Sequence, residues 1–383
     1  MIRKELKKLE NEIRNYRRQL HKIPELGLNT IQTKEYLIQQ LSKFGVDEIK
    51  QGYALQGMVV RIKGKDSTKM IGFRCEMDGL PIKDETNCTY QSIHEHNSHS
   101  CGHDGHMAMM LGLIHYLCLH KKSLKQDVVC IFQPGEEAQG GAKLMIENGL
   151  LKDYPIHLLI GLHLLGSLAY GRIASKAGPI MARNGEVTIH VKGKSAHAGF
   201  PCLGKDAIYI AATLINQMQS IISKNIDPFK QAVLSIGTIH GGEAINQIAD
   251  LVTLQGTIRS LDDQSYELIK TRLQTLCKGI KQAYDCEIDC SLLDLYHVVN
   301  NPEDLNTMLQ EVSKDAYVES KAMMMCEDFS FFQEKIPALY YFIGTKDEQH
   351  QANLHEGNFN FKEEILLYGI ETNLRILEKL KII

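Results

Sequence analysis

Residues 99–106 read His-Ser-Cys-Gly-His-Asp-Gly-His, so a thiol, three imidazoles and a carboxylate fall within eight consecutive positions. The glycines at 102 and 105 permit tight turns, which allow neighbouring polar side chains to point at one place. This composition is typical of a metal-binding loop. A single Cys-Gly-His run is weak evidence, however, because free cysteines and single histidines usually have ordinary structural roles. The rest of the chain must therefore supply further ligands.

The elements around this stretch predict an α/β fold. Residues 107–119 are apolar and should form a buried helix, so that Cys101 and His103 lie in the loop leading into it. Residues 58–62, 70–75, 128–132 and 156–165 are predicted to be strands, and 128–132 is continuously apolar, as in a strand covered on both faces. Open α/β sheets place their chemistry at strand ends. Glu76 and Asp78 follow the second strand, although an acidic turn would explain them equally well.

From about residue 181 apolar and polar residues alternate, which is typical of a strand with one exposed face. A helix at 206–223, strands near 233–239 and 251–258, a helix near 266–284 and a strand near 287–293 complete the order βαββαβ of a small α+β sandwich. Further βα elements resume after Pro302. We therefore predict a domain formed by residues 1–180 and 295–383, with a second domain, 181–294, inserted into it.

The bulk composition limits the possible partners. The 383 residues suit two domains, and 43 basic against 46 acidic residues give a formal net charge of −3. No strong field therefore favours nucleic acid or an anionic membrane. The first twenty residues lack the apolar run of a signal peptide, and ten cysteines in such a chain predict reduced thiols in the cytoplasm. We expect a cytoplasmic protein that acts on a small molecule.

Other candidate ligands follow the predicted strands. Two adjacent glutamates come after the strand at 128–132 and before a double glycine, where a solvated helix start is the ordinary alternative. A histidine interrupts the strand at 156–165, either as a core residue or as a ligand. Another lies in the run Asn-Leu-His-Glu-Gly at 353–357. The candidate metal ligands are Cys101, His103, Glu137, His163 and His355.

Five ligands exceed the needs of one tetrahedral ion but suit two divalent ions that share a thiolate. Glu136 then remains beside the site. In a two-metal hydrolase the ions lower the pKa of a bound water, and a nearby carboxylate takes its proton. A thiolate, imidazole and carboxylate set accepts Mn²⁺ or Zn²⁺, and also Co²⁺ or Ni²⁺.

Eight runs, in order along the chain, resemble the amidohydrolase branch of the aminoacylase and glutamate-carboxypeptidase metallopeptidases, family M20. They lie at 20–27 (LHKIPELG), 74–81, 101–106, 132–137, 161–163, 193–197, 256–259 and 326–329. That branch holds aminoacylases, hippurate hydrolases, N-acetyldiaminopimelate deacetylases and auxin-conjugate hydrolases. The resemblance implies an α/β, mixed-sheet catalytic domain with two metal ions, and an inserted lid domain that forms a dimer.

The resemblance also assigns the ligands to individual ions. Cys101 would bridge the two ions. Glu137 and His355 would hold one ion, while His103 and His163 would hold the other.

Further roles are implied for residues outside the ligand set. Glu136 would be the general base. In the lid, His197 would reach across the dimer to stabilise the tetrahedral oxyanion, helped by Asn246, and Arg259 would bind the substrate α-carboxylate. Glu76 stands where the family generally has aspartate, and a longer carboxylate could misplace a metal ligand.

We predict a dimeric, dinuclear metalloamidase that removes the acyl group from an N-acyl amino acid of the hippurate, N-acetyl amino acid or N-acetyldiaminopimelate type. One alternative is a ligand-binding protein of the same fold that has lost turnover, motivated by Glu76. Another is a dipeptidase of the same fold. A structural zinc site would leave Glu136 unexplained, because such sites need no adjacent base.

Overall fold

The computed structural model describes residues 2–137 and 140–383, and the chain divides into two compact units. Unit 1 comprises Met1–Gly178, Asn300–Lys321 and Asp328–Ile383. Unit 2 comprises Pro179–Val299 and Ala322–Glu327. Among the described residues, no helix combines the length and the apolar character needed to cross a membrane.

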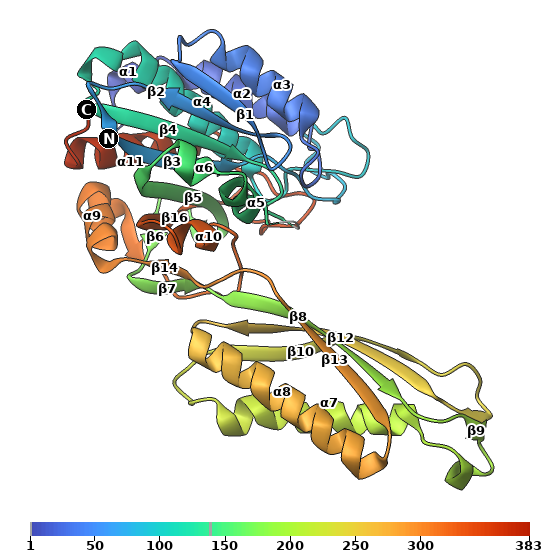
Figure 1. The fold of residues 1–383 in the computed structure, drawn as a ribbon. Helices are drawn as coiled ribbons and strands as arrows, with labels where there is room; N and C mark the ends of the chain where they lie inside the picture. The colour runs from blue at the N-terminus through green and yellow to red at the C-terminus, as the bar shows by residue number, and fades with distance from the viewer. Residues whose placement is uncertain (1, 138–139) are drawn as a thin grey trace. The chain divides into compact units, whose positions relative to one another are not determined.

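Unit 1 is built on a mixed sheet whose order is β1-β2-β4-β3-β5-β16-β6-β15 (Figure 1). Its strands are β1 (Glu48–Tyr53), β2 (Gly57–Ile62), β3 (Asp66–Glu76), β4 (Gln126–Gln133), β5 (Ile156–Ala169), β6 (Ile173–Ser175), β15 (Tyr317–Glu319) and β16 (Ala338–Lys346). The four central strands β4, β3, β5 and β16 are parallel to their neighbours in that series. Their carboxyl ends therefore meet at one edge of the sheet.

Helices enclose this sheet, and α4 packs against both α2 and α11. The helices of unit 1 are α1 (Lys4–Lys7), α2 (Glu10–His21), α3 (Ile31–Leu41), α4 (His103–Leu119), α5 (Gly141–Glu147), α6 (Leu150–Asp153), α9 (Glu303–Ser313), α10 (Ser330–Gln333) and α11 (Ile365–Lys379). The first three turns of α4 are fully buried. Helix packing is close enough that a Cβ at Gly112 of α4 would lie 2.6 Å from Ile370 Cδ1 and 2.9 Å from Ile13 Cδ1.

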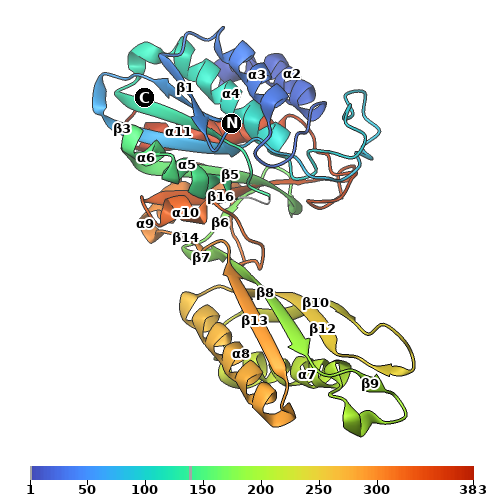
Figure 2. The same ribbon diagram turned by 45° about the vertical axis from the view of Figure 1, so that its right-hand side comes forward.

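Unit 2 has the element order βαββαβ, as predicted. It consists of β8 (Arg183–Lys192), α7 (Ala207–Asn225), β10 (Ala232–Gly241), β12 (Leu251–Ser260), α8 (Asp263–Tyr284) and β13 (Glu287–Asp294). The strands form an antiparallel sheet in the order β10-β12-β8-β13. Figure 2 shows α7 and α8 against one face of this sheet, where alternate residues Val187, Ile189 and Val191 of β8 join their core.

Short elements complete the described chain. They are β7 (Gly178–Met181), β9 (Ala196–His197), β11 (Gln247–Ile248), β14 (Val299–Asn301) and the 3-10 turns Lys121–Ser123, Pro201–Leu203 and Lys314–Ala316. Strand β9 pairs with β11, and the chain passes between the two units at β7 and β14. The domain limits 1–180, 181–294 and 295–383 stay a prediction about functional domains.

The predicted fold class, an α/β mixed sheet, is confirmed, but one local expectation was wrong. The helix predicted to begin at Met107 begins at His103, so His103 is helical and only Cys101 lies in the loop. The reason is Gly102, whose φ of +84° turns the chain into the helix one turn earlier. Asp104 also favours a helix start at this point, because its negative charge lies in the first turn, at the positive end of the helix dipole.

Two glycines in helix interiors give a matched test of packing. Gly112→Ala should destabilise unit 1 by about 1–3 kcal/mol, because the added methyl overlaps Ile13 and Ile370. Gly279→Ala in α8 should instead stabilise unit 2 by roughly 0.5–1 kcal/mol, because no atom lies within 4 Å of its Cβ and alanine favours helix. Denaturant titration measures both variants. Equal shifts of the same sign would contradict this account of the packing.

Candidate metal centre

The five predicted ligands come together at the carboxyl edge of the central strands. Cys101 lies in the loop just before α4, His103 is the first residue of α4, and His163 lies on β5. Glu137 follows β4, and His355 is in the loop between β16 and α11. The structure thus gathers residues that are more than 250 positions apart in the sequence.

The side chains form two overlapping groups that share Cys101. Ligand atoms of Cys101, His103 and His163 lie within 4.8 Å of one another, as do those of Cys101, Glu137 and His355. The Cys101 Sγ is 3.4 Å from His163 Nε2. The two oxygens of Glu137 lie 3.9 Å from His103 Nε2 and 3.5 Å from His355 Nε2. This arrangement suits two cations with a common thiolate.

Hydrogen bonds aim the imidazoles at the centre. His103 Nδ1 donates to the Asp78 carbonyl oxygen at 2.8 Å, and His163 Nδ1 donates to the Leu164 carbonyl oxygen at 2.6 Å. Each ring therefore turns its Nε2 towards the cluster, which is the usual arrangement of metal-bound histidine. Among the described residues, nothing donates a hydrogen bond to the buried Oε1 of Glu137. A cation at this point would satisfy that oxygen, so the residues fit a metal ion.

The charge at Glu137 is also suited to a cation. Burial alone would raise the pKa of Glu137, but the His355 hydrogen bond and the His103 and Cys101 side chains lower it to about 2. The same hydrogen bond raises the pKa of His355. Glu137 is consequently an anion at neutral pH, although it is largely buried.

Asp78 holds the turn that carries both glutamates. Its Oδ1 accepts the backbone N–H of Glu136 and its Oδ2 that of Glu137, each at 3.2 Å. Asp78 is fully buried, and burial together with the charge of Glu137 raises its pKa to about 8. From the sequence, Asp78 could belong either to an ordinary acidic turn or to a functional site. Its place after β3, parallel and adjacent to β4, makes it part of the site.

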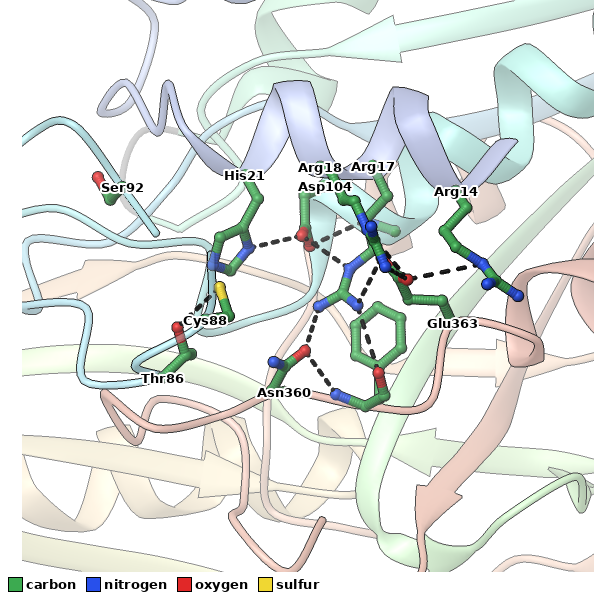
Figure 3. A network of polar contacts seen from close by, with 12 residues as sticks. Arg14, Arg17, Arg18, His21, Thr86, Cys88, Ser92, Asp104, Asn360 and Glu363 are labelled. Carbon is green, nitrogen blue, oxygen red and sulfur yellow. Dashed lines mark hydrogen bonds and ion pairs between the residues drawn. The ribbon is translucent and has the colours of Figure 1, made fainter. Parts of the chain in front are cut away.

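A buried polar network ties the same region to α2, and Figure 3 shows it in detail. Arg17 Nε donates to Asp104 Oδ2 at 3.1 Å, and Arg17 Nη2 donates to Asn360 Oδ1 at 2.6 Å. Asp104 follows His103 directly, and Asn360 is in the same loop as His355. Arg17 therefore connects two segments that carry candidate ligands, a role that the sequence analysis missed.

His21 extends this network from the end of α2 (Figure 3). Its Nδ1 donates to Asp104 at 2.8 Å and its Nε2 donates to Asp84 at 3.2 Å. Burial opposes the charge on His21, but hydrogen bonds to Asp104, Asp84 and Cys88 raise its pKa well above the ordinary value. His21 is thus a buried imidazolium between two carboxylates. The only sequence signal was its place in the run at 20–27.

The remaining predicted site residues belong to unit 2. His197 and Asn246 are exposed and lie close together, because β9 pairs His197 with Gln247 and Ala198 N donates to the Asn246 carbonyl at 2.9 Å. Arg259 is on β12, and its Nη1 donates to the Met324 carbonyl oxygen at 2.5 Å. The roles of these three residues stay predictions.

Comparison with known proteins decides the family. The family model described as peptidase family M20/M25/M40 matches residues 72–379, which is most of the chain. The chain belongs to this family. The metallopeptidase resemblance drawn from the sequence is therefore confirmed, and the protein is an amide-hydrolysing M20 enzyme.

Relatives of this M20 enzyme match it along almost the whole chain. An N-acetyldiaminopimelate deacetylase of Listeria monocytogenes is 37% identical over 372 residues, covering 96% of this chain and 99% of the relative. The N-acetyldiaminopimelate deacetylase of a Geobacillus species is also 37% identical, covering 92% of this chain and 94% of the relative.

Solved structures agree with this fold. The crystal structure of a putative aminohydrolase from methicillin-resistant Staphylococcus aureus has a TM-score of 0.91 and 28% identity, covering 99% of this M20 chain and 98% of that chain. A dinuclear metal-binding M20 peptidase from Bacillus subtilis has a TM-score of 0.84 and 27% identity, covering 97% and 99% respectively.

The raised pKa of His21 predicts a pH-dependent contribution to the stability of the enzyme. A histidine whose pKa is raised by folding stabilises the fold fully below its unfolded pKa of about 6.5 and loses this effect as pH rises through its folded pKa. The free energy of unfolding of the wild type relative to His21→Gln should thus be largest below about pH 6.5 and shrink as the pH rises through the raised pKa of the folded state. The pKa values of Asp84 and Asp104 are lowered in the folded state, so these carboxylates lose their contribution to stability only in acid.

Guanidinium denaturation at fixed metal concentration measures this difference. His96→Gln is the matched control, because it removes an imidazole whose side chain is 80% exposed. A His21→Gln difference that stays constant across this pH range would contradict the assignment of a buried imidazolium.

Proposed function

We propose that this M20 enzyme removes the acyl group from N-acyl amino acids, and that its substrate is of the N-acetyldiaminopimelate type. The observation that supports the chemistry is the two overlapping ligand groups that share Cys101. The substrate class is supported by two deacetylases that match over at least 92% of this chain. Glu137 and His355 would hold one ion, and His103 and His163 the other.

Two divalent ions, when bound, would polarise the scissile carbonyl and lower the pKa of the attacking water. The chain's own residues do the proton transfer. Glu136 takes the proton from the water and later delivers it to the leaving amine. The Asp78 contact to the Glu136 backbone holds this base next to Glu137. We propose Mn²⁺ or Zn²⁺ as the native metal, since the ligand set accepts both, with Co²⁺ or Ni²⁺ as possible substitutes.

Unit 2 would complete the site as a lid. His197 and Asn246 would donate hydrogen bonds to the oxyanion, and Arg259 would bind the α-carboxylate. We propose that unit 2 also forms a homodimer. Its support is β10, which is at the edge of its sheet and carries Ile239 with 52% of its surface exposed. The outer side of an edge strand offers unpaired backbone groups with which a second copy can pair.

We also propose a cytoplasmic location. All ten cysteines lie among the described residues and all are free thiols, which suits a reducing compartment.

A substrate panel tests the proposed specificity. On protein loaded with Mn²⁺ or Zn²⁺, N-acetyldiaminopimelate should have the highest kcat/KM, followed by other N-acetyl amino acids and hippurate. Amine release measures the rate. Preferential cleavage of dipeptides would point to a dipeptidase, and binding of N-acyl amino acids without turnover would point to a ligand-binding protein.

Replacement of Glu136 tests the base. Glu136→Gln should lower kcat by at least about 10²- to 10⁴-fold, because the group that moves the proton is lost, while two ions per chain remain bound. Metal analysis by mass spectrometry checks the second point. Retained activity would show that another group is the base.

Replacement of the shared ligand tests the bridge. Cys101→Ala should weaken the binding of both ions, since each ligand group contains this thiol. Cys75→Ala is a suitable control, because Cys75 is buried on β3 and belongs to neither ligand group. Two firmly bound ions in the Cys101 variant would contradict a shared thiolate.

A further inference from the structure

Glu76 and His106 form a buried pair beside the metal centre that the proposed reaction does not use. Glu76 ends β3, and His106 lies one turn into α4 after His103. Glu76 Oε2 accepts a hydrogen bond from His106 Nδ1 at 2.6 Å. Both side chains are almost completely buried. A buried carboxylate that pairs with an imidazole in such a place needs a structural or functional reason.

The other side of the His106 ring leads to a metal ligand. A carboxylate only accepts hydrogen bonds, so Glu76 fixes the ring proton on Nδ1 and leaves Nε2 as an acceptor. That acceptor receives the backbone N–H of Leu164 at 3.0 Å. The carbonyl oxygen of Leu164 in turn accepts the bond from His163 Nδ1 at 2.6 Å. Hydrogen bonds on both sides of Leu164, joined through the backbone of that residue, thus connect Glu76 with the ring of His163.

The second carboxylate oxygen of Glu76 also has a partner. Its Oε1 pairs with the Arg74 guanidinium, two residues earlier on the same strand. Arg74 also donates to Asp328 Oδ1 at 2.6 Å and to Gln133 Oε1 at 2.8 Å. With both carboxylate oxygens occupied, Glu76 has little freedom to rotate. The position of His106 is therefore set by the sheet and not by α4 alone.

His106 is not suited to be a ligand. Atoms of Glu76, His103 and His106 lie close enough to form a group that could hold a cation. However, both nitrogens of His106 already have partners, Glu76 on one side and the Leu164 amide on the other. Its ring centroid lies 4.6 Å from that of His163 and 5.4 Å from that of His103. His106 therefore acts as a spacer between two ligand rings.

We propose that Glu76 and His106 are positioning residues, which fix the 163–164 peptide so that His163 Nε2 points at Cys101. The inference rests on the proposed metal centre and extends it. It predicts that the pair secures the ion held by His103 and His163. The ion held by Glu137 and His355 depends instead on the turn that Asp78 supports.

Two variants of His106 separate the two hydrogen bonds. Glutamine places an amide oxygen near the position of Nε2, so His106→Gln can still accept from Leu164. Asparagine places its amide nitrogen near the position of Nδ1, so His106→Asn can still donate to Glu76 but does not reach Leu164. If the contact to the peptide is what matters, His106→Gln should retain metal better than His106→Asn.

Glu76→Gln tests the source of the alignment, and Asp127→Asn is its matched control. Asp127 is also a fully buried carboxylate in the same sheet and pairs with Arg61 Nη2 at 2.5 Å. It lies at the start of β4, whereas the glutamates of the metal centre follow the end of that strand. Both substitutions remove a buried charge and should lower thermal stability. Only Glu76→Gln should change metal binding.

The experiment counts ions on zinc-loaded full-length protein during titration with a competing chelator. The wild type should retain two ions, with similar curves for Asp127→Asn. Glu76→Gln and His106→Asn should lose one ion at about 10- to 100-fold lower chelator concentration and keep the second. His106→Gln should lie between them and the wild type.

The inference would be overturned if Glu76→Gln and His106→Asn gave the same chelator curves as the wild type. Loss of one ion from Asp127→Asn at the same chelator concentration would also overturn it. So would equal curves for the two His106 variants. If Glu76→Gln does not fold, the His106 pair alone decides. Failure of the proposed metal centre is distinguishable, because the wild type would then bind fewer than two ions before any substitution.

Discussion

The carboxylate of Glu137 lies between the imidazoles of His103 and His355, at 3.9 and 3.5 Å, with the Cys101 thiol in reach of the same point. Placing the buried His103 and Cys101 beside the largely buried Glu137 is unfavourable unless a cation compensates them, whereas 49% of the His355 side chain is exposed. An ionised Glu137 with a buried oxygen that receives no hydrogen bond from the described chain is the clearest sign of this constraint. Much of unit 1 serves to keep these side chains together.

Separate supports hold different ligands. Asp78 fixes the turn of Glu137, and the Glu76 and His106 pair fixes the peptide of His163. Arg17 joins the segment after His103 to the loop of His355. The supports lie at the end of β3 or just after it, on α4 and on α2, whereas most of the candidate ligands lie in loops. This division lets the loops provide the chemistry while packed elements provide the geometry.

Much of the site was predictable because the ligand types are rare and follow strands. Glu137 follows an apolar strand and His163 interrupts one, and parallel strands bring such points to one edge, whereas Cys101 precedes an apolar helix. The βαββαβ order of unit 2 was equally plain from its alternation. Short or edge strands were missed, since β1 is largely polar and β15 has only three residues.

The supporting residues were harder to predict. Arg17 and His21 have the spacing of a polar helix face, and only tertiary packing buries them against Asp104. The sequence raised the question whether the longer Glu76 could misplace a metal ligand; its two oxygens bond Arg74 and His106, so the side chain has a partner at each oxygen. The functions of His197, Asn246 and Arg259 stay predictions, because they involve the substrate and, for His197, the proposed second subunit.

X-ray absorption at the metal edge of zinc-loaded protein tests the central claim, a pair of ions that share the Cys101 thiolate. The account predicts sulfur at about 2.3 Å from zinc, nitrogen and oxygen ligands near 2.0–2.2 Å, and a second zinc at about 3.5–4 Å. The sulfur contribution should disappear in Cys101→Ala. A shell of nitrogen and oxygen alone, with no neighbouring metal, would contradict the account.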